Sequence, residues 1–177
     1  YGVAEYWDSA SNTLHWVAEA NFSNSNPVDA FDFPLRELLK GLCDQYGFGL
    51  KNLVNGESIL QKQPQTTVTF VENHDLRDEG RPITNDKLLA YSYILTHEGF
   101  PCVFWKDYFN FNLALDGMPN GIAALVAAHE KYAGGSTSIL YLSDDLYLMQ
   151  RGGYGNQPGL IYVLNNRGDR WDGAWVN

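Results

Sequence analysis

The sequence predicts an α/β protein, with a helix-covered parallel sheet in the first part of the chain and a small antiparallel β region after it. Up to Gly134, short runs of β-branched and aromatic residues alternate with longer segments of helical periodicity, which is typical of βαβ units. From Ile139 onward, apolar segments follow one another across Asp-, Gly- and Asn-rich turns, which indicates an antiparallel meander. A domain boundary is therefore expected between Gly134 and Thr137, dividing the chain into residues 1–134 and 135–177.

Strands are expected where short apolar runs end in polar residues. Val3-Ala4 opens the chain, and Val28–Phe33 is the next such run. Thr66–Val71 is a β-branched and aromatic run with alternating faces, and Asn73, a residue that suits turns, ends it. The meander is expected to contain four strands: Ile139–Leu142, Leu146–Arg151, Leu160–Asn165 and Ala174–Val176.

Helices are expected where apolar residues recur at helical spacing. The segments with this spacing are Ser11–Phe22, Pro34–Gly47, Thr84–Glu98 and Gly121–Tyr132. Pro34 suits the first turn of its helix, and Gly134-Gly135 ends the last one. The third segment is apolar over most of its surface, which predicts a helix buried between the sheet and its neighbours. Leu50–Pro64 is expected to be irregular or weakly helical.

The charge and composition argue against nucleic acid and anionic membrane as partners. The formal net charge is −9, from 21 Asp and Glu against 12 Lys and Arg, and the sequence has no basic stripe. No apolar run approaches the ~20 residues that a membrane-spanning helix needs. Cys43 and Cys102 each lie in an apolar stretch without CxxC spacing, so two buried thiols are expected rather than a disulfide.

No metal site is expected. His15, His97 and His129 have no metal-ligand spacing and are interpreted as helix residues. Asp144-Asp145 and Asp169–Asp172 lack the alternating acids of a calcium loop and are interpreted as turns.

Two polar strings at strand ends carry the strongest functional signal. Glu5-Tyr6-Trp7 follows the opening strand, and Asn73-His74-Asp75 follows the strand that ends at Val71. Barrel enzymes keep their chemistry at strand carboxyl ends, and glycoside hydrolysis needs two carboxyl groups on opposite sides of a sugar. Glu5 suits the acid, because apolar rings beside it would favour a protonated carboxyl group. The alternative is a solvated Glu at a strand end.

Glu72 lies in the same stretch, but the strict alternation of side chains along a strand does not place Glu72 and Asp75 on the same face of the sheet. It is therefore expected to have a supporting role at most.

The two strings, in this order and about seventy residues apart, resemble the α-amylase family of glycoside hydrolases, family 13. In that family a strand ending in Glu-Tyr-Trp supplies the general acid/base, which the resemblance assigns to Glu5. A later strand ending in Asn-His-Asp supplies the acid that stabilises the transition state, which corresponds to Asp75. The resemblance also implies that His74 contacts a hydroxyl of the same sugar.

The resemblance extends along the chain and implies a fold. Ala30–Leu35 looks like the family's sixth strand running into its helix, Phe100–Trp105 looks like the eighth, and the residues after Gly134 look like the antiparallel domain. The implied fold is the second half, strands five to eight, of a TIM (β/α)₈ barrel followed by part of that domain. A whole barrel takes ~250 residues, so the 177 residues are expected to be an excised or incomplete segment. The family's nucleophilic aspartate, on its fourth strand, is expected to be absent.

The implied activity is retaining hydrolysis of α-1,4 links in starch-like glucans, with the isolated chain inactive. Tyr6, Trp7, Asn73 and Trp105 are the further candidates for substrate binding; for Trp7 and Trp105, packing is an equally good interpretation. Two departures from the family pattern, Leu76–Glu79 and Trp105-Lys106-Asp107, put the substrate contacts of these loops in doubt. Two alternatives stay open: a non-catalytic glucan-binding module and a self-associating half-barrel, which could also pair with the missing half.

The resemblance has two further implications. No cofactor is expected in this segment, because the family's usual calcium site draws mostly on segments that are absent here; calcium stays open for the parent enzyme. Secretion is favoured as the location.

Overall fold

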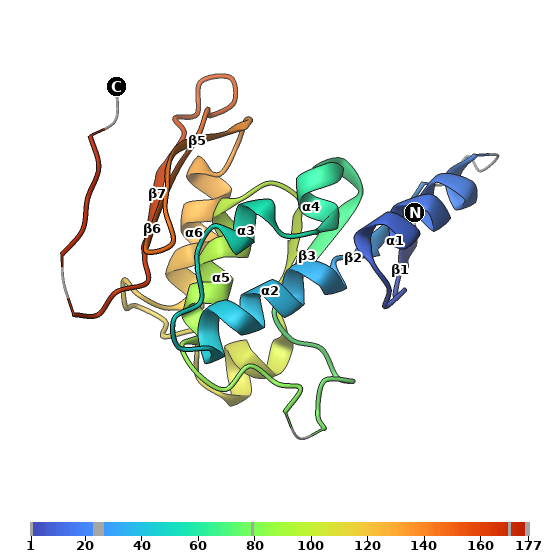
Figure 1. Cartoon of the computed structure of the whole chain (residues 1–177), viewed down its shortest axis with the longest axis horizontal. Coiled ribbons are helices and arrows are strands. Elements are labelled where there is room, and N and C mark those ends of the chain that lie inside the picture. Colours follow the sequence, from blue (N-terminus) through green and yellow to red (C-terminus); the bar gives the residue numbers. More distant parts are fainter. Residues whose placement is uncertain (1, 23–26, 79, 170, 176–177) are drawn as a thin grey trace.

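A computed structural model describes residues 2–22, 27–78, 80–169 and 171–175, and it contains two sheets (Figure 1). The first has the strand order β1-β2-β3-β4, and all its neighbouring strands are parallel. Its strands are β1 (Gly2–Ala4), β2 (Val28–Phe31), β3 (Thr67–Phe70) and β4 (Phe100–Cys102). The prediction of a parallel sheet is confirmed. The half-barrel stays a prediction.

Helices follow the strands of this sheet. The four longer ones lie close to the segments that the hydrophobic spacing predicts, and two short ones lie within Leu50–Pro64, which was expected to be irregular or weakly helical. The helices are α1 (Ala10–Asn21), α2 (Phe33–Asp44), α3 (Asn52–Asn55), α4 (Ile59–Lys62), α5 (Lys87–Thr96) and α6 (Ile122–Tyr132). A 3₁₀ turn, η1 (Pro64–Thr66), precedes β3, and a π-helical turn, η2 (Lys106–Asn110), follows β4. The sequence pattern does not predict η2.

The start of α2 is fixed by the buried carboxylate of Asp32. Its Oδ1 accepts a hydrogen bond from the backbone N–H of Leu35 at 3.0 Å, and its Oδ2 accepts one from Leu60 at 2.8 Å. Asp32 therefore caps α2 and ties it to α4. Phe33, which we expected to end the strand, instead begins this helix.

The second sheet is antiparallel, with the order β5-β6-β7. Its strands are β5 (Thr137–Leu142), β6 (Leu146–Arg151) and β7 (Ile161–Asn165), which confirms three of the four predicted strands. The fourth prediction, Ala174–Val176, is wrong for its described residues: Ala174 and Trp175 lie in no strand, because neither pairs with β7. Val176 lies outside the described residues.

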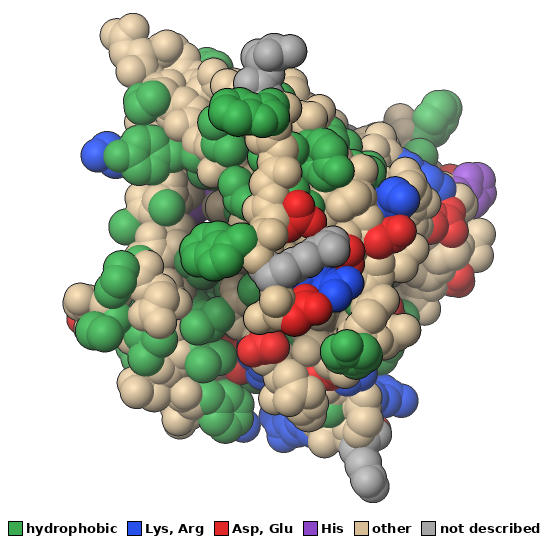
Figure 2. Space-filling model, turned by 60° about the vertical axis from the view of Figure 1, so that its left-hand side comes forward, with side chains coloured by type: hydrophobic (Ala, Val, Ile, Leu, Met, Phe, Trp, Pro, Cys, Tyr) green, Lys and Arg blue, Asp and Glu red, His purple; other side chains and the backbone are tan. Residues whose placement is uncertain are grey.

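One hydrophobic cluster joins the antiparallel sheet to the helices and to residues that follow β3 and β4, such as Val71 and Val103. It includes Leu39 of α2, Ile94 of α5, and Tyr147 and Leu164 of the antiparallel sheet. Figure 1 shows β5–β7 beside α6 and α5, with β1 and α1 at the opposite end of the molecule. On the face shown in Figure 2, most hydrophobic side chains lie toward the left of the view, whereas acidic and basic side chains lie next to one another toward the centre and right. The predicted boundary between residues 134 and 137 stays a prediction.

The two cysteines are both free, but only one is buried as predicted. Cys43 packs into the main core, whereas Cys102 is exposed. The reason is the strand order, since β4 pairs only with β3 in the described part of the chain and forms an edge of the sheet. Among the described residues, no helix has the length and apolar character needed to cross a membrane.

Candidate active site

The carboxyl ends of the four parallel strands lie at one edge of the first sheet, and the predicted acids follow two of them. Glu5 comes directly after β1, and Asp75 comes five residues after the end of β3. The register pairs Ala4 with Ala30 of β2, and Ala30 with Thr67 of β3. With ~4.8 Å between neighbouring strands, the backbones of β1 and β3 are about 10 Å apart.

Aromatic contacts join the segments that follow β1, β2 and β3. The ring of Trp7 stacks on Phe33, with ring centroids 4.9 Å apart, and Phe33 meets Phe70 edge-on at 5.1 Å. The guanidinium carbon of Arg81 lies 5.2 Å from the centroid of Trp7. The structure therefore brings the segments of Glu5 and Asp75 to the same edge.

Glu5 is exposed, which corrects one expectation from the sequence. Its neighbouring rings do not surround it, because Trp7 packs on Phe33 and Tyr6 lies against Trp16 of α1, with ring centroids 6.1 Å apart. The apolar surroundings expected for an acid catalyst are thus not present around Glu5 in the described part of the chain.

Asn73 shapes the segment that presents His74 and Asp75. Its Oδ1 accepts hydrogen bonds from the backbone N–H groups of Asp75 at 3.0 Å and Leu76 at 3.1 Å, so it forms an Asx turn. His74 Nε2 lies 3.4 Å from Asp75 Oδ1, and both side chains are more than 60% exposed. The imidazole and the carboxylate are accessible to a ligand together.

Trp105 and Trp7 combine packing with exposure. Trp105 is 67% exposed and its ring centroid lies 4.1 Å from that of Phe109 in η2. Trp7 is 50% exposed, although it also contacts Phe33 and Arg81. Each ring keeps a surface on which a sugar can stack.

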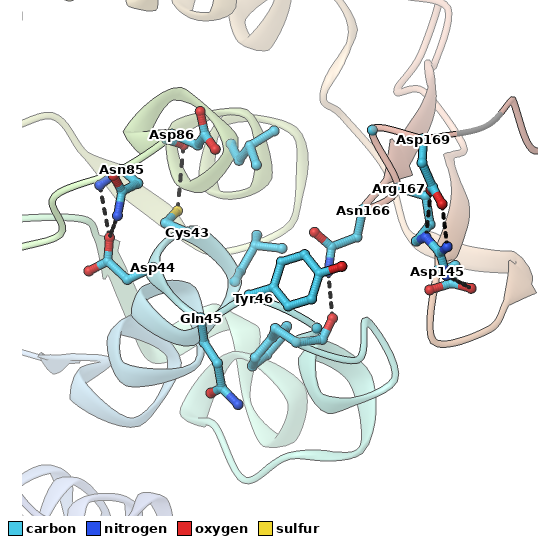
Figure 3. A pocket seen from close by; sticks show the side chains of 15 residues that line it. Cys43, Asp44, Gln45, Tyr46, Asn85, Asp86, Asp145, Asn166, Arg167 and Asp169 are labelled. Carbon is cyan, nitrogen blue, oxygen red and sulfur yellow. Dashed lines mark hydrogen bonds and ion pairs between the residues drawn. The ribbon is translucent and has the colours of Figure 1, made fainter.

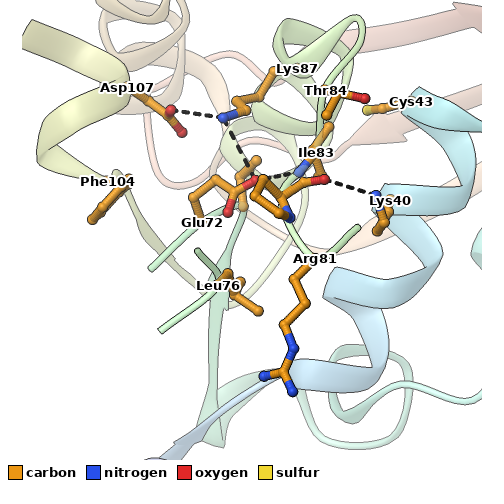
Figure 4. A network of polar contacts seen from close by, with 12 residues as sticks. Lys40, Cys43, Glu72, Leu76, Arg81, Ile83, Thr84, Lys87, Phe104 and Asp107 are labelled. Atoms are coloured by element: carbon orange, nitrogen blue, oxygen red, sulfur yellow. Dashed lines mark hydrogen bonds and ion pairs between the residues drawn. The ribbon is translucent and has the colours of Figure 1, made fainter. Parts of the chain in front are cut away.

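A buried network of charged residues lies behind this edge (Figure 4). Glu72 Oε1 accepts a hydrogen bond from the backbone N–H of Ile83 at 2.6 Å and lies 3.5 Å from Arg36 Nη2 and 3.6 Å from Lys87 Nζ. Burial raises the pKa of Glu72, although the Ile83 N–H and the two cations act in the opposite direction. Glu72 thus has the supporting position that was expected.

The network continues to the loop after β4. Lys87 Nζ donates a hydrogen bond to Asp107 Oδ1 at 2.9 Å, and the Tyr91 hydroxyl donates to Asp107 Oδ2 at 2.6 Å. Asp107 is fully buried, so it acts within the fold and is not presented to solvent. Burial, with Asp107 nearby, raises the pKa of Tyr91, which keeps its hydroxyl a hydrogen-bond donor.

Arg36 holds the segment after β3 in place. It is 1% exposed, and it donates hydrogen bonds to the backbone carbonyls of Val71 and Arg81. The sequence pattern did not predict functional roles for Arg36, Lys87 and Asp107. A charged residue inside the apolar stretch of α2 was the one available signal for Arg36.

A cavity of about 230 Å³ opens between the segments after β3 and β4. We call it the β3–β4 hollow, and it is lined by Glu72, Asn73, Leu76, Arg77, Pro82, Lys87, Phe104, Lys106, Asp107 and Phe111. Of the predicted site residues, Asn73 lines it.

A second cavity, of about 640 Å³, lies elsewhere, between the end of α2, the start of α5 and the residues after β7 (Figure 3). Its polar groups largely contact one another: Asn85 donates to Asp44, and Arg167 contacts Asp145 and Asp169. None of the predicted site residues lines this cavity. Among the described residues, no group of three or more His, Cys, Asp or Glu side chains is suited to hold a metal ion.

Comparisons with known proteins agree with the resemblance in the sequence, although no family model matches the chain. The chain is 31% identical over 168 residues to an α-amylase of Geobacillus stearothermophilus, covering 90% of this chain and 30% of the relative. It is 32% identical to a glucan 1,4-α-maltohexaosidase of Bacillus sp. (strain 707), covering 97% of this chain and 34% of the relative.

The comparison with solved structures agrees with the resemblance as well. A γ-cyclodextrin glucanotransferase (γ-CGTase) from alkalophilic Bacillus clarkii superposes with a TM-score of 0.65 at 20% identity, covering 95% of this chain and 28% of that one. The chain thus spans about a third of the length of the curated relatives it matches. The sequence relatives place the chain in the α-amylase family, glycoside hydrolase family 13, and the solved structure has a similar fold.

Proposed function

We propose that the carboxyl edge of β1–β4 supplies the acid/base and the sugar-binding groups of a retaining glycosidase that acts on α-1,4-glucan. The observation that carries the proposal is the contact of Trp7 with Phe33 and Arg81, because it joins the segments that bear the two acids. The names of the relatives, an α-amylase and a glucan 1,4-α-maltohexaosidase, support an α-glucan as the ligand.

In this proposal Glu5 protonates the leaving glycosidic oxygen and later accepts a proton from water. Asp75 and His74 bind hydroxyls of one glucose ring, and those hydrogen bonds accelerate the reaction only if they strengthen in the transition state. Trp7 and Trp105 stack on sugar faces. No residue of this sequence matches the family's nucleophilic aspartate, so we expect the 177 residues by themselves not to hydrolyse glucan.

Calorimetric titration with maltoheptaose tests the binding part of the proposal. We expect Asp75→Asn and Trp7→Ala each to weaken binding about tenfold, because each removes a charged hydrogen-bond acceptor or a stacking ring. Trp175→Ala is the matched control, because Trp175 is also an exposed tryptophan but lies beyond β7. Equal affinity of the wild type and the three variants for maltoheptaose would contradict a glucan-binding site at this edge.

Reducing-sugar release from starch tests the catalytic part. The wild-type chain is expected to release none. Release that disappears in Glu5→Gln would show that the chain contains its own nucleophile, and the proposed division of roles would be wrong. Glucan binding that needs Trp7 but neither Glu5 nor Asp75 would favour a non-catalytic module.

A further inference from the structure

The sequence contains two Asn-Gly pairs, Asn55-Gly56 and Asn120-Gly121. In such a pair the backbone nitrogen of the glycine can attack the side-chain amide carbon of the asparagine, because glycine has no Cβ to block the approach. The N–H proton passes to the departing amide nitrogen, so ammonia leaves and a succinimide ring closes. Water then opens the ring at one of its two carbonyl carbons, which gives either aspartate or isoaspartate. The chemistry of the two pairs is the same, so their surroundings decide which one reacts.

The folded structure protects the first pair. Both asparagines are exposed, but Asn55 is the last residue of α3. The Gly56 N–H donates a hydrogen bond to the Asn52 carbonyl oxygen at 2.9 Å, and the Asn55 N–H donates one to the Lys51 carbonyl oxygen at 2.8 Å. Because the Gly56 nitrogen must break its hydrogen bond before it can attack, the fold slows the reaction at Asn55.

The second pair lacks this protection. Asn120 is exposed in the turn that precedes α6, and within the described residues the Gly121 N–H donates no hydrogen bond. Packing requires a glycine at position 121, because a Cβ there would lie 2.2 Å from the Ala114 carbonyl oxygen and 2.4 Å from the Leu115 Cβ. The fold therefore places the residue that best permits succinimide formation directly after an exposed asparagine.

The first two residues of α6 hold the loop that follows β4. The Ile122 N–H donates a hydrogen bond to the Leu113 carbonyl oxygen at 2.9 Å. The Ala123 N–H donates one to the Ala114 carbonyl oxygen at 3.1 Å. A change in the main chain at position 120 or 121 therefore acts directly on these two hydrogen bonds.

The same loop residues also contact η2. The Leu113 N–H donates a hydrogen bond to the Asp107 carbonyl oxygen at 3.0 Å, and the Ala114 N–H donates one to the Tyr108 carbonyl oxygen at 3.3 Å. The next residue, Leu115, has φ +44°, a left-handed conformation that persists in a leucine only where neighbouring contacts impose it. One short, strained segment thus joins α6 to η2.

We propose that Asn120 is a spontaneous modification site, and that its conversion to isoaspartate releases the loop after β4 from α6. Isoaspartate adds a carbon atom to the main chain where Gly121 leaves no spare room. The hydrogen bonds from Ile122 and Ala123 then lose their alignment. Conversion to ordinary aspartate keeps the main-chain length and places a carboxylate near the amino end of α6, which favours the helix. The modification does not depend on glucan binding.

Peptide mapping by mass spectrometry, with isoaspartate detected by isoaspartyl methylation, tests the site after incubation of the 177-residue chain in mildly alkaline buffer. We expect conversion at Asn120 to be about tenfold faster than at Asn55, because the Gly56 hydrogen bond must break first. In urea the fold that distinguishes the two pairs is absent, so the two rates should be similar. Equal rates in the folded chain, or the same ratio of rates in urea, overturn the proposal.

Hydrogen exchange at the N–H groups of Ile122 and Ala123 tests the release of the loop. In the isoaspartate fraction of incubated wild type, both groups should exchange about tenfold faster than before incubation. Incubated Asn120→Gln should keep the slow rates, because the longer side chain closes a ring far more slowly, and Asn55→Gln is the matched control that should behave as wild type. Freshly purified Asn120→Asp separates charge from main-chain length and should also exchange slowly. Unchanged exchange in the isoaspartate fraction, or fast exchange in fresh Asn120→Asp, contradicts the proposed release.

Discussion

The buried imidazole of His97 makes the stability of the fold depend on pH. His97 caps the end of α5, is 5% exposed, and stacks on Tyr93 with ring centroids 3.7 Å apart. Its Nδ1 lies 2.8 Å from the Tyr93 carbonyl oxygen and its Nε2 lies 3.0 Å from the Tyr147 hydroxyl. A neutral ring satisfies both contacts, donating through Nδ1 and accepting through Nε2. Burial lowers the pKa of His97 to about 3, with Arg151 acting in the same direction and the Tyr93 carbonyl against it.

The sign of this pH dependence follows from the protonation of His97 in the folded and in the unfolded chain. Between pH 6.5 and pH 3 the unfolded chain binds a proton at this histidine and the folded chain does not, so the free energy of unfolding falls as the pH falls. The unfolded chain has the ordinary histidine pKa of ~6.5, so pH 5 lies about 1.5 units below it. At about 1.36 kcal/mol per pH unit, protonation of this histidine lowers the free energy of unfolding by about 2 kcal/mol.

Urea unfolding at pH 7.5 and pH 5.0 measures this loss. Wild type contains other titrating groups, so the informative quantity is the difference between wild type and His97→Gln, which cannot bind the proton. We expect the pH-dependent drop in unfolding free energy to be about 2 kcal/mol smaller in His97→Gln. His15→Gln is the control, because the side chain of His15 is 75% exposed on α1. An equal drop in wild type and His97→Gln would refute the reasoning.

Three further predictions concern the stability of the fold. Arg36→Met should lower the free energy of unfolding, measured in urea, by about 3–5 kcal/mol, because it leaves buried Glu72 without one of its cations. A loss below about 1 kcal/mol would contradict a stabilising contact between Arg36 and Glu72. Asp44 is partly buried, which raises its pKa, but hydrogen bonds from Lys40 and two backbone N–H groups outweigh this and lower it to about 2. Asp44→Asn should therefore cost about 2 kcal/mol at pH 7 and little at pH 2, since the stabilisation is lost as the pH falls below ~4; equal costs at both pH values contradict this. Gly135→Ala should lower the midpoint of thermal unfolding, because Gly135 has φ +79° and an added Cβ would lie 2.2 Å from the Gly153 carbonyl oxygen. Gly168→Ala is the control and should leave the midpoint unchanged, because an added Cβ there meets no atom within 4 Å. Equal midpoints in the two variants would contradict the expected clash.

The element types could be predicted from the sequence because they depend on local pattern. Thr66–Val71 alternates and ends at a turn residue, and the structure has β3 within one residue of each predicted end. Likewise, the apolar surface predicted for Thr84–Glu98 corresponds to α5, which is buried between the sheet and its neighbours.

The contacts around the site could not be predicted, because they join residues far apart in the chain. Glu72 meets Arg36 and Lys87 only after α2 and α5 pack against β3, and no local spacing encodes that meeting. The exposure of Cys102 depends on β4 being an edge strand, which only the strand order decides. The position of Glu5 was predicted, but its surroundings were not, because Tyr6 turns toward α1 and Trp7 turns toward α2.

The indole N–H signals of the five tryptophans test the central claim most directly. In a nitrogen-15 correlation spectrum, titration with maltoheptaose should shift the signals of Trp7 and Trp105 at the carboxyl edge and leave those of Trp171 and Trp175 unchanged. Saturable shifts confined to Trp171 and Trp175, or no shift at any of the five, would contradict the assignment of glucan binding to this edge.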